Sequence, residues 1–282
     1  MIVGVIGIGV VGGAIKKSFE LHAPSVDLRC YDKTGEYSGE ENRLRILDAE
    51  VIFVCVPTPT QHGGQNLEAL CNVIEMLNTA KYQGVICIKC TVLPGMCEYI
   101  ASTYPLRIVH NPEFLTAAKP YEDFMNQKSI IMSGKLQDTN EVQRIYDHLF
   151  GSHALYDFYQ TYADYKVTEL AKYYSNCFLA VKVTFANEMY DLCNMIGANY
   201  DDVRTAAISQ GLIGANHTKV PGTDGKTGYG LGCLPKETQA LSTFCSMIGL
   251  QQEVLNAAML GNTKRRSFDS HCREINEKEI VI

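Results

Sequence analysis

The chain begins Met1-Ile-Val-Gly-Val-Ile6-Gly7-Ile8-Gly9-Val10-Val11-Gly12, and this segment indicates the class of fold. Its apolar start predicts a short buried strand, and the G-x-G-x-x-G turn that follows leads directly into a helical pattern. In such a turn Gly7 permits the tight bend, Gly9 lets a pyrophosphate approach the backbone, and Gly12 lets helix and strand pack closely. Because a helix N-terminus also offers N–H groups to phosphates, the pattern predicts a dinucleotide site made by Gly7, Ile8, Gly9, Val10, Val11 and Gly12.

The second predicted strand ends at a carboxylate that indicates which dinucleotide binds. Asp32 stands twenty residues after Gly12, where an acid accepts hydrogen bonds from the adenosine ribose and repels a 2′-phosphate. Lys33, beside it, acts in the opposite sense by attracting a phosphate. We therefore expect NAD rather than NADP, with Asp32 and Lys33 among the cofactor-binding residues. The alternative is a glycine turn without a ligand, which leaves the agreement of strand, spacing and acid unexplained.

Alternating apolar runs and helix-like stretches over the first 150 or so residues predict a parallel α/β sheet. The runs are nearly continuous, as is typical of strands that helices cover on both faces. A helical period over residues 66–79 lies between two of these runs. We expect an N-terminal doubly wound Rossmann domain with strands at residues 2–6, 26–31, 51–56, 85–89, 107–110 and 129–132.

Two later loops of this sheet should face the same ligand, since open α/β sheets bind at the carboxyl ends of their strands. Residues 56–59 and 90–95 form these loops and offer the hydroxyl groups of Thr58 and Thr91 to the cofactor or to a bound water. Threonine beside proline is also common turn chemistry, so a purely structural role is an equal alternative.

After about residue 156 the pattern becomes helical. Residues 162–196 contain no proline or glycine, end at Gly197, and would span roughly 50 Å as one helix. Such a helix commonly joins domains or pairs with its own copy, so a homodimer is expected. Further helices are predicted at residues 201–210 and 235–248. We expect a Rossmann domain at residues 1–158, an all-α domain built on the long helix at 159–263, and a charged tail at 264–282.

Composition argues against several classes of protein. The 282 residues include 25 basic and 31 acidic side chains and are 46% hydrophobic, which argues against disorder and against a basic nucleic-acid-binding protein. No apolar run approaches the roughly 20 residues that span a bilayer, so no membrane partner is expected. The N-terminus lacks the basic region of a signal peptide, and an odd number of cysteines, eleven, indicates reduced thiols in a cytoplasmic protein.

The pair Cys87 and Cys90 fits a C-x-x-C pattern, which in some proteins binds a metal ion. Cys87 falls on the strand predicted at residues 85–89 and Cys90 follows its last residue, and positions i and i+3 of an extended chain point to opposite faces. No second pair at ligand spacing accompanies them, so we expect no metal site.

A glycine-rich loop far downstream carries the most informative cysteine. Five glycines among residues 222–233 allow the backbone to approach a ligand closely, and Cys233 follows them. Pro235 sits where a helix would begin. A thiol near a helix N-terminus, Lys226 and Lys236 has the surroundings of a nucleophile with a lowered pKa. The alternative, which holds for most cysteines, is a buried core residue.

Three segments of the chain resemble one enzyme family. Residues 228–237, Gly-Tyr-Gly-Leu-Gly-Cys-Leu-Pro-Lys-Glu, resemble the catalytic-cysteine motif of the UDP-glucose/GDP-mannose dehydrogenases, usually G-F-G-G-x-C-F-P-K-D. Residues 111–115 resemble the N-P-E-F-L segment of that family, and residues 169–176 resemble its E-L-x-K-x-x-x-N helix. Together with the N-terminal glycine motif, the resemblance runs in the family's order from residue 1 to about residue 262.

The resemblance implies an NAD-dependent four-electron oxidation at C6 of a nucleotide-linked hexose such as UDP-glucose. In that chemistry the Cys233 thiolate attacks the aldehyde, the thiohemiacetal loses a second hydride to become a thioester, and water hydrolyses the thioester to the uronic acid. Both adducts develop an oxyanion that needs fixed donors. Lys172 and Asn176, at i and i+4 on the long helix, would supply them, while Glu113 would assist a water held by Thr91.

The same resemblance assigns the remaining site residues. Lys236 would reach the cofactor or the substrate, and Glu237 would replace the family's usual aspartate near Cys233. The catalytic set is then Cys233, Lys172, Asn176, Glu113, Thr91 and Glu237. The substrate-binding set is Glu113, Phe114, Leu115, Lys172, Asn176, Gly222, Lys226 and Gly230.

Some features depart from the family pattern. Ala117 occupies the position of a second acid, and Glu237 is one methylene longer than aspartate. Leu212 stands where an arginine that reaches a neighbouring subunit's substrate is usual. The sequence ends at Ile282, where the family usually continues into a second α/β domain, so we expect a short form that lacks this C-terminal nucleotide-binding domain.

Two other functions fit parts of the pattern. A two-electron dehydrogenase of the hydroxy-acid or 6-phosphogluconate type also places a long helix after a Rossmann domain, but it needs no cysteine nucleophile. A non-catalytic homologue that binds NAD or a sugar would keep the fold without efficient chemistry. The number of NADH molecules formed per sugar distinguishes the three functions.

Overall fold

The computed structural model describes residues 1–61, 64–151, 158–230 and 232–266. Contacts between Cα atoms divide the chain into two compact units. One comprises Met1–Pro59 and Gln65–Lys172, and the other comprises Thr60–Gly64 and Tyr173–Ile282. The first unit holds the large sheet, and the second is mainly helical.

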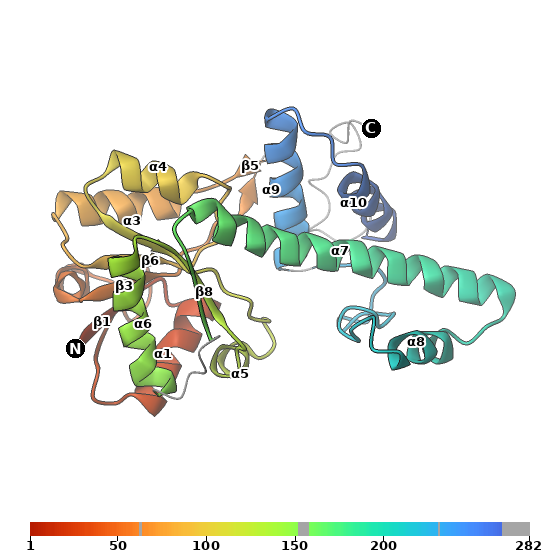
Figure 1. The fold of residues 1–282 in the computed structure, drawn as a ribbon, viewed down its shortest axis with the longest axis horizontal. Helices are drawn as coiled ribbons and strands as arrows, with labels where there is room; N and C mark the ends of the chain where they lie inside the picture. The colour runs from red at the N-terminus through yellow and green to blue at the C-terminus, as the bar shows by residue number, and fades with distance from the viewer. Residues whose placement is uncertain (62–63, 152–157, 231, 267–282) are drawn as a thin grey trace. The chain divides into compact units, whose positions relative to one another are not determined.

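The first unit is built on a seven-stranded sheet with the order β2-β1-β3-β6-β7-β8-β9 (Figure 1). Neighbouring strands from β2 to β7 run parallel, whereas β8 is antiparallel to β7 and β9 is parallel to β8. This arrangement confirms the predicted α/β Rossmann fold. The strands are β1 (Ile2–Ile6), β2 (Asp27–Tyr31), β3 (Val51–Val54), β6 (Val85–Ile88), β7 (Arg107–His110), β8 (Ile130–Gly134) and β9 (Tyr159–Tyr162).

The last two strands differ from the sequence prediction of a wholly parallel sheet. Between β7 and β8 the chain forms only the six-residue helix α5 (Pro120–Met125), and β8 then runs antiparallel to its neighbour. The strand β9 was not predicted, because its sequence Tyr-Gln-Thr-Tyr is half polar and largely exposed. It lies at the edge of the sheet, where a strand needs no continuous apolar run.

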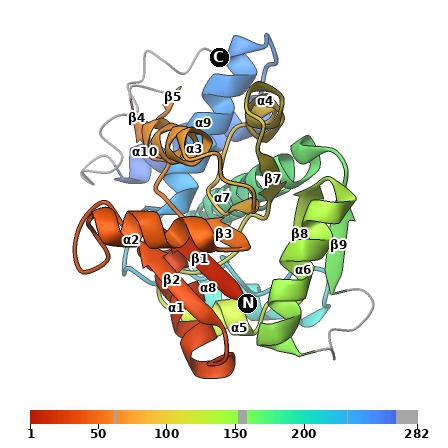
Figure 2. The same ribbon diagram turned by 90° about the vertical axis from the view of Figure 1, so that its left-hand side faces the viewer.

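Helices cover both faces of the sheet (Figure 2). The apolar side chains of α1 (Val10–His22), α5 and α6 (Leu136–Phe150) pack in one core cluster. Those of η1 (Ile46–Asp48), α3 (Glu68–Thr79) and α4 (Met96–Thr103) pack in another. Every residue of β3 and β6 is buried, as their continuous apolar runs predict. Ligands therefore reach this sheet at the ends of its strands.

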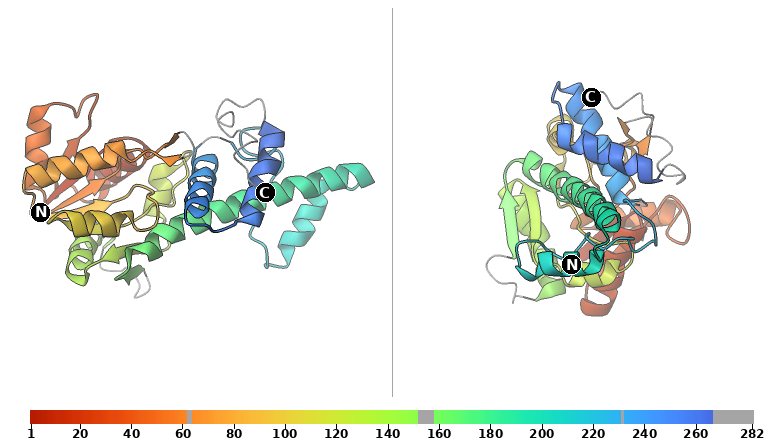
Figure 3. Two further views of the ribbon diagram at one scale, coloured as in Figure 1. Left: turned by 90° about the horizontal axis from the view of Figure 1, so that it is seen from above. Right: turned by 90° about the vertical axis from the view of Figure 1, so that its right-hand side faces the viewer.

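The long predicted helix is α7 (Tyr165–Ile196), a single helix of 32 residues (Figure 3). It begins three residues later than predicted, because residues 159–162 form β9. In its second turn the buried Glu169 carboxylate accepts the N–H groups of Gly95 at 2.6 Å and Cys97 at 2.8 Å. These donors lie at the N-terminus of α4, where N–H groups lack helical partners. Glu169 thereby ties the start of α7 to the first unit.

The division between the compact units falls inside α7, after Lys172. The domain boundaries predicted between residues 158 and 159 and between 263 and 264 remain predictions. Most of the predicted tail, from residue 267 onward, lies outside the described residues.

The second unit contains the rest of α7 together with α8 (Tyr200–Ser209), α9 (Cys233–Met247) and α10 (Glu253–Arg266). The first two of these shorter helices match the predicted ranges to within two residues. Helix α10 was not predicted, because its buried face includes the polar residues Asn262 and Arg266 and its apolar periodicity is weak. No described helix combines the length and the apolar composition needed to cross a bilayer.

A small two-stranded ladder, β4 (Thr60–Gln61) with β5 (Gly64–Gln65), separates β3 from α3 in the sequence. Its first residue belongs to the second unit, where the Thr60 hydroxyl donates to the Lys236 carbonyl at 2.8 Å. The sequence of this segment predicts neither strand.

Candidate active site

The glycine turn lies between β1 and α1. Gly7 has φ 88°, a conformation that favours glycine, and a Cβ built on it would lie 2.8 Å from the Cys55 carbonyl oxygen. A Cβ on Gly12 would lie 1.9 Å from the Gly7 carbonyl oxygen, so only glycine permits this approach of helix and strand. Around Gly9, by contrast, no described atom lies within 4 Å of such a Cβ. The turn therefore leaves room for a pyrophosphate, and residues 7–12 fit a dinucleotide.

Asp32 follows β2 and reaches the glycine turn. Its Oδ2 accepts the N–H of Ile8 at 2.7 Å, and its Oδ1 accepts the N–H of Thr34 at 3.2 Å. Because a carboxylate oxygen can accept more than one hydrogen bond, ribose hydroxyls can still bind there. Lys33 is exposed beside it. Asp32 thus lies where the sequence predicts a ribose ligand, and it also braces the turn.

The two threonine loops meet each other. The Thr58 hydroxyl donates to the Thr91 carbonyl at 2.8 Å, and both residues are buried. Gln65, which sequence analysis missed, donates to the same carbonyl at 2.7 Å and accepts the N–H of Leu93 at 3.0 Å. The Thr58 hydroxyl therefore fixes the loop that carries Thr91. A role for either hydroxyl toward the cofactor stays a prediction.

Glu113 and Lys172 form a buried pair in the first unit. The Lys172 Nζ donates to the Glu113 carbonyl oxygen at 2.6 Å and to its Oε1 at 3.2 Å. The other carboxylate oxygen accepts the N–H of Leu115 at 2.6 Å, and the Lys172 Nζ lies 5.2 Å from the centre of the Phe114 ring. The lysine side chain is only 2% exposed. The structure thus brings together four residues that the sequence assigned to one site.

Asn176 and Glu237 form a second pair, in the second unit. The Asn176 amide donates to the Glu237 carboxylate, and Glu237 is 1% exposed. The Cys177 thiol points to the Glu237 carbonyl at 3.9 Å, and the Lys236 Nζ lies 3.6 Å from the Glu237 Oε1. Glu237, whose side chain is one methylene longer than the aspartate usual in the family, therefore reaches Asn176. Asn176 lies one turn beyond Lys172 on α7.

Cys233 is the first residue of α9 and is exposed. The residue before it, Gly232, has φ 83°, which lets the chain turn sharply into the helix. The first N–H groups of a helix favour a negative charge, and a thiolate is such a charge. An accessible thiol at this place can serve as a nucleophile. Pro235, predicted to open the helix, lies in its first turn, where a missing N–H costs nothing.

Most other cysteines have a different environment. Cys87, Cys90, Cys97, Cys177, Cys193 and Cys245 are buried. Burial raises the pKa of both Cys87 and Cys177 to about 12, which suits inert core thiols. Within the described part of the chain no group of three or more His, Cys, Asp or Glu side chains could hold a metal ion.

Two buried asparagines hold the glycine-rich loop before Cys233. The Asn187 Oδ1 accepts the N–H of Gly228 at 2.9 Å. Asn262 accepts the N–H of Tyr229 at 2.7 Å and donates to its carbonyl oxygen at 2.8 Å. Gly228 has φ 73°, and a Cβ on it would lie 2.6 Å from the Asn262 Oδ1. The loop therefore needs glycine at this position.

Arg266 adds a third contact to the same loop. It donates to the Gly228 carbonyl at 2.9 Å and forms an ion pair with Asp224 at 2.7 Å. The Arg266 guanidinium holds the pKa of the Asp224 carboxyl below its usual value. None of Asn187, Asn262 and Arg266 was predicted, because polar residues on helices carry no motif that identifies their partners.

Three predicted substrate-binding residues, Gly222, Lys226 and Gly230, belong to this loop and differ in solvent exposure. Gly222 donates its N–H to the Lys226 carbonyl at 2.8 Å, which closes a tight turn. Lys226 is exposed, and Gly230 is half-buried. Of the departing positions, Ala117 is exposed and Leu212 is 91% exposed.

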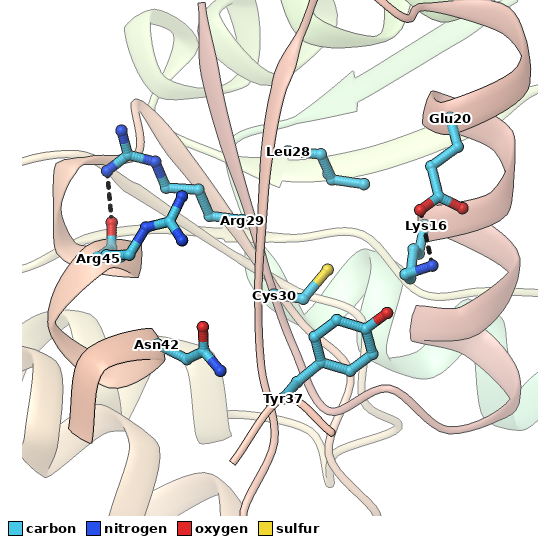
Figure 4. Close-up of a pocket in the computed structure, with 8 residues that line it drawn as sticks. All are labelled: Lys16, Glu20, Leu28, Arg29, Cys30, Tyr37, Asn42 and Arg45. Atoms are coloured by element: carbon cyan, nitrogen blue, oxygen red, sulfur yellow. Dashed lines mark hydrogen bonds and ion pairs between the residues drawn. The ribbon is translucent and has the colours of Figure 1, made fainter. Parts of the chain in front are cut away.

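A separate cavity of about 340 Å³ lies beside β2 (Figure 4). Two of its charged side chains form ion pairs, Lys16 with Glu20 at 2.7 Å and Arg29 with Asp27 at 3.0 Å. None of the predicted site residues lines it. The lining residues are Lys16, Glu20, Leu28, Arg29, Cys30, Tyr37, Asn42 and Arg45.

Comparison with known proteins agrees with these observations. Residues 32–150 match the NAD binding domain of the UDP-glucose/GDP-mannose dehydrogenase family, and residues 166–264 match the central domain of the same family. The first range begins at Asp32, and the second includes Lys172, Asn176 and Cys233. The UDP-glucose 6-dehydrogenase of Rickettsia felis is 31% identical over 247 residues, with 81% of this chain and 52% of the relative covered. The chain thus spans about half the length of the curated relatives it matches.

Solved structures agree on the fold. A UDP-glucose dehydrogenase from Pyrobaculum islandicum matches with a TM-score of 0.78 at 22% identity, covering 93% of this chain and 68% of that one. A 3-hydroxyisobutyrate dehydrogenase from Mycobacterium tuberculosis matches with a TM-score of 0.71 at 15% identity, covering 96% and 95%. With two domain models of one family in the expected order, the chain belongs to the UDP-glucose/GDP-mannose dehydrogenase family and carries its NAD binding domain.

Proposed function

We propose that the chain oxidises the C6 hydroxyl of a nucleotide sugar, UDP-glucose or a close analogue, to the uronic acid. One observation carries the proposal. Two buried donors lie on successive turns of α7, and each forms a hydrogen bond with a glutamate: Lys172 with Glu113, and Asn176 with Glu237. Donors fixed in this way suit an oxyanion that forms during reaction, because they need no rearrangement when the charge develops.

The glycine turn and Asp32 supply the cofactor site in this proposal. Backbone N–H groups at residues 7–12 bind the pyrophosphate of NAD, and Asp32 binds the ribose hydroxyls and disfavours a 2′-phosphate. When bound, NAD accepts hydride, and two NAD molecules in turn take one hydride each from the same carbon. The exposed Lys33 lies beside this site.

The covalent steps are assigned to Cys233. The C6 alcohol becomes an aldehyde by losing one hydride and one proton. The Cys233 sulfur then bonds to the aldehyde carbon, and the former carbonyl oxygen takes up a proton to give a thiohemiacetal. Loss of a second hydride and that proton gives a thioester. One water then breaks the C–S bond, which releases the uronate and restores the thiol.

The oxyanion and the protons transferred in these steps determine the roles that we assign to the other residues. The Lys172 ammonium and the Asn176 amide donate to the oxyanion, and Glu113 takes a proton from the attacking water. Thr91 holds that water. Glu237 orients Asn176, and Lys236 reaches the cofactor or the substrate. Phe114, Leu115, Gly222, Lys226 and Gly230 contact the nucleotide sugar in this proposal.

We also propose that two successive domains of the chain carry the cofactor site and the thiol. Residues 1–158 form the domain that binds NAD, and residues 159–263 form the domain that carries the thiol. Because the chemistry requires a reduced Cys233, and the described cysteines are thiols, we place the protein in the cytoplasm.

A homodimer formed through α7 is part of the proposal. Exposed apolar side chains recur at spacings of three, four or seven residues along this helix, which places them on one stripe. An apolar stripe of this length is typical of an interaction surface. Phe178→Glu should therefore lower the mass measured by sedimentation to that of a monomer. The stripe consists of Val167, Leu170, Tyr174, Phe178, Phe185, Leu192 and Ile196.

A substrate panel tests the proposed reaction. NADH formed per sugar consumed is measured with UDP-glucose, UDP-N-acetylhexosamines and GDP-mannose, each as the limiting reagent. Two NADH per sugar support the proposal. One NADH per sugar indicates a two-electron dehydrogenase, and no NADH with any sugar indicates a non-catalytic binding protein.

A further inference from the structure

The core of the first unit contains a lysine that the proposed mechanism does not use. Lys89 follows β6 directly and is 3% exposed. Its Nζ donates to the Asn111 Oδ1 at 2.8 Å and to the Tyr146 hydroxyl at 3.4 Å. Among the residues that the structure describes, Lys89 forms no ion pair. A buried ammonium without a counter-ion is costly, and an apolar side chain would fill the same space without that cost.

The contacts of Lys89 lead to the residue before Pro112. The Asn111 Oδ1 accepts hydrogen bonds from both Lys89 and Tyr146, the latter at 2.6 Å. The Asn111 amide donates to the Ile131 carbonyl at 2.8 Å, and its backbone N–H donates to the Ile88 carbonyl at 2.9 Å. Hydrogen bonds at its side-chain oxygen, its side-chain amide and its backbone N–H therefore fix Asn111 at the end of β7.

Glu113 follows Asn111 after one proline. The pyrrolidine ring of Pro112 fixes one backbone dihedral, so the orientation of Asn111 is passed on to the next residue with little freedom. At that next residue the Lys172 Nζ contacts both the carbonyl and the carboxylate of Glu113. A continuous series of contacts thus runs from Lys89 to the pair proposed to act on water and oxyanion.

The ionisable groups around Lys89 include the Glu113 carboxylate. Burial lowers the pKa of Lys89. The ionisable groups that interact with it are Cys87, Cys55, Glu113 and Lys172, and Tyr146 lies against it. Burial raises the pKa of Cys87 to about 12, and it also raises the pKa of Cys55 and of Tyr146, so these groups are neutral. Glu113 is the one carboxylate in this set.

We propose that Lys89 is a positioning residue for the Glu113–Lys172 pair. It fixes Asn111 and thereby the backbone of Glu113, and so holds the Glu113 carboxylate in place as an acceptor for the proton of the attacking water. This inference rests on the proposed function, because it assigns that task to Glu113.

Lys89→Met tests the inference in the full chain, with Arg107→Met as the matched control. Arg107 lies at the opposite end of β7, where it binds Asp138 and Glu141, so its loss also breaks a partly buried charge network. Both variants should lower the thermal midpoint. Only Lys89→Met should lower kcat with UDP-glucose, by about tenfold or more, while KM for NAD stays within about twofold of wild type.

Two kinetic results would overturn the inference. One is a folded Lys89→Met protein with wild-type kcat, and the other is an equal loss of kcat in Arg107→Met. If the wild-type protein forms no NADH with any nucleotide sugar, the proposed function fails, and a crystal structure of Lys89→Met decides the positioning claim alone. The Lys172 Nζ to Glu113 Oε1 contact, 3.2 Å in the wild-type chain, should then be lost, and an unchanged contact would overturn the claim.

Discussion

The Lys172 ammonium contacts both the backbone carbonyl and the carboxylate of Glu113, although the two residues lie 59 positions apart in the chain. The lysine comes from α7, and the glutamate follows β7. Removing one member of a buried ion pair leaves the other charge uncompensated. The pair therefore couples the start of the long helix to the loop after β7.

Replacement of the lysine should abolish most activity. Lys172→Met removes a proposed oxyanion donor and the partner of Glu113, so kcat should fall by about 100-fold or more while NAD affinity is retained. Initial rates of NADH formation and calorimetric titration with NAD measure the two effects. Lys166→Met is the matched control. Lys166 is an exposed lysine on the same helix, where it forms an ion pair with Glu98 of α4. A Lys172→Met enzyme with nearly normal kcat would remove this residue from the mechanism.

Asp32 should determine the choice of cofactor. Asp32→Ala removes the acceptor of the Ile8 N–H and of the ribose hydroxyls, so the Kd for NAD should rise about tenfold or more. Relative affinity for NADP should increase, because the repulsion of a 2′-phosphate is lost. Asp27→Ala, at the other end of β2, should change neither constant. Equal Kd values for wild type and Asp32→Ala would contradict the assignment.

Gly228 should be intolerant of a side chain. Gly228→Ala would place a Cβ 2.6 Å from the Asn262 Oδ1 at a positive φ, so the free energy of unfolding should fall by roughly 1–3 kcal/mol. Activity should fall as well, since this loop leads to Cys233. Gly214→Ala has no described atom within 4 Å of the new carbon and should have little effect. Chemical denaturation of both variants is the measurement, and equal stabilities would refute the prediction.

The buried His110 should make stability depend on pH. Burial lowers its pKa from 6.5 to about 3, with its Nδ1 at 2.7 Å from the Thr168 hydroxyl. Below pH 6.5 the unfolded chain binds a proton that the folded chain does not, so stability is complete above that pH and falls by roughly 1.4 kcal/mol per unit as pH decreases toward 3. Urea unfolding of wild type and His110→Gln between about pH 5 and pH 8 isolates this effect, with the exposed His22→Gln as control. Parallel pH dependences for wild type and His110→Gln would disprove it.

Ala117 should make hydrolysis of the thioester slow. The resemblance places a second acid at this exposed position, so Ala117→Glu should accelerate the last step by about tenfold. During turnover, intact-protein mass spectrometry should detect a covalent adduct on wild-type Cys233 and less of it in Ala117→Glu. Ala118→Glu introduces the same charge one residue later and should not change the adduct. Wild-type protein without any adduct at steady state would argue against slow hydrolysis.

The first part of the fold could be predicted because its signals are local. The strand Ile2–Ile6, the turn at residues 7–12 and Asp32 follow one another at short spacing, and the buried strands carry continuous apolar runs. The strand β9 and the helix α10 could not be predicted in this way. One is a polar edge strand, and the other buries Asn262 and Arg266, so neither has the periodicity that identifies an element.

The candidate site was predictable only where residues match a motif. Glu113 and Lys172 were assigned to one site by resemblance, since nothing local in the sequence relates residues so far apart. The contacts of Lys89 with Asn111, and of Asn262 with Tyr229, join residues 22 and 33 positions apart, and one partner in each, Lys89 or Asn262, lies outside any quoted motif. Such partners become visible only when the fold places their elements together.

Single-turnover experiments with limiting UDP-glucose on wild type and Cys233→Ser decide whether Cys233 carries a four-electron oxidation. Wild type should form two NADH and one UDP-glucuronate per sugar. The variant should form no uronate while still binding NADH. A single NADH per sugar from wild type, or undiminished uronate from Cys233→Ser, would contradict the mechanism.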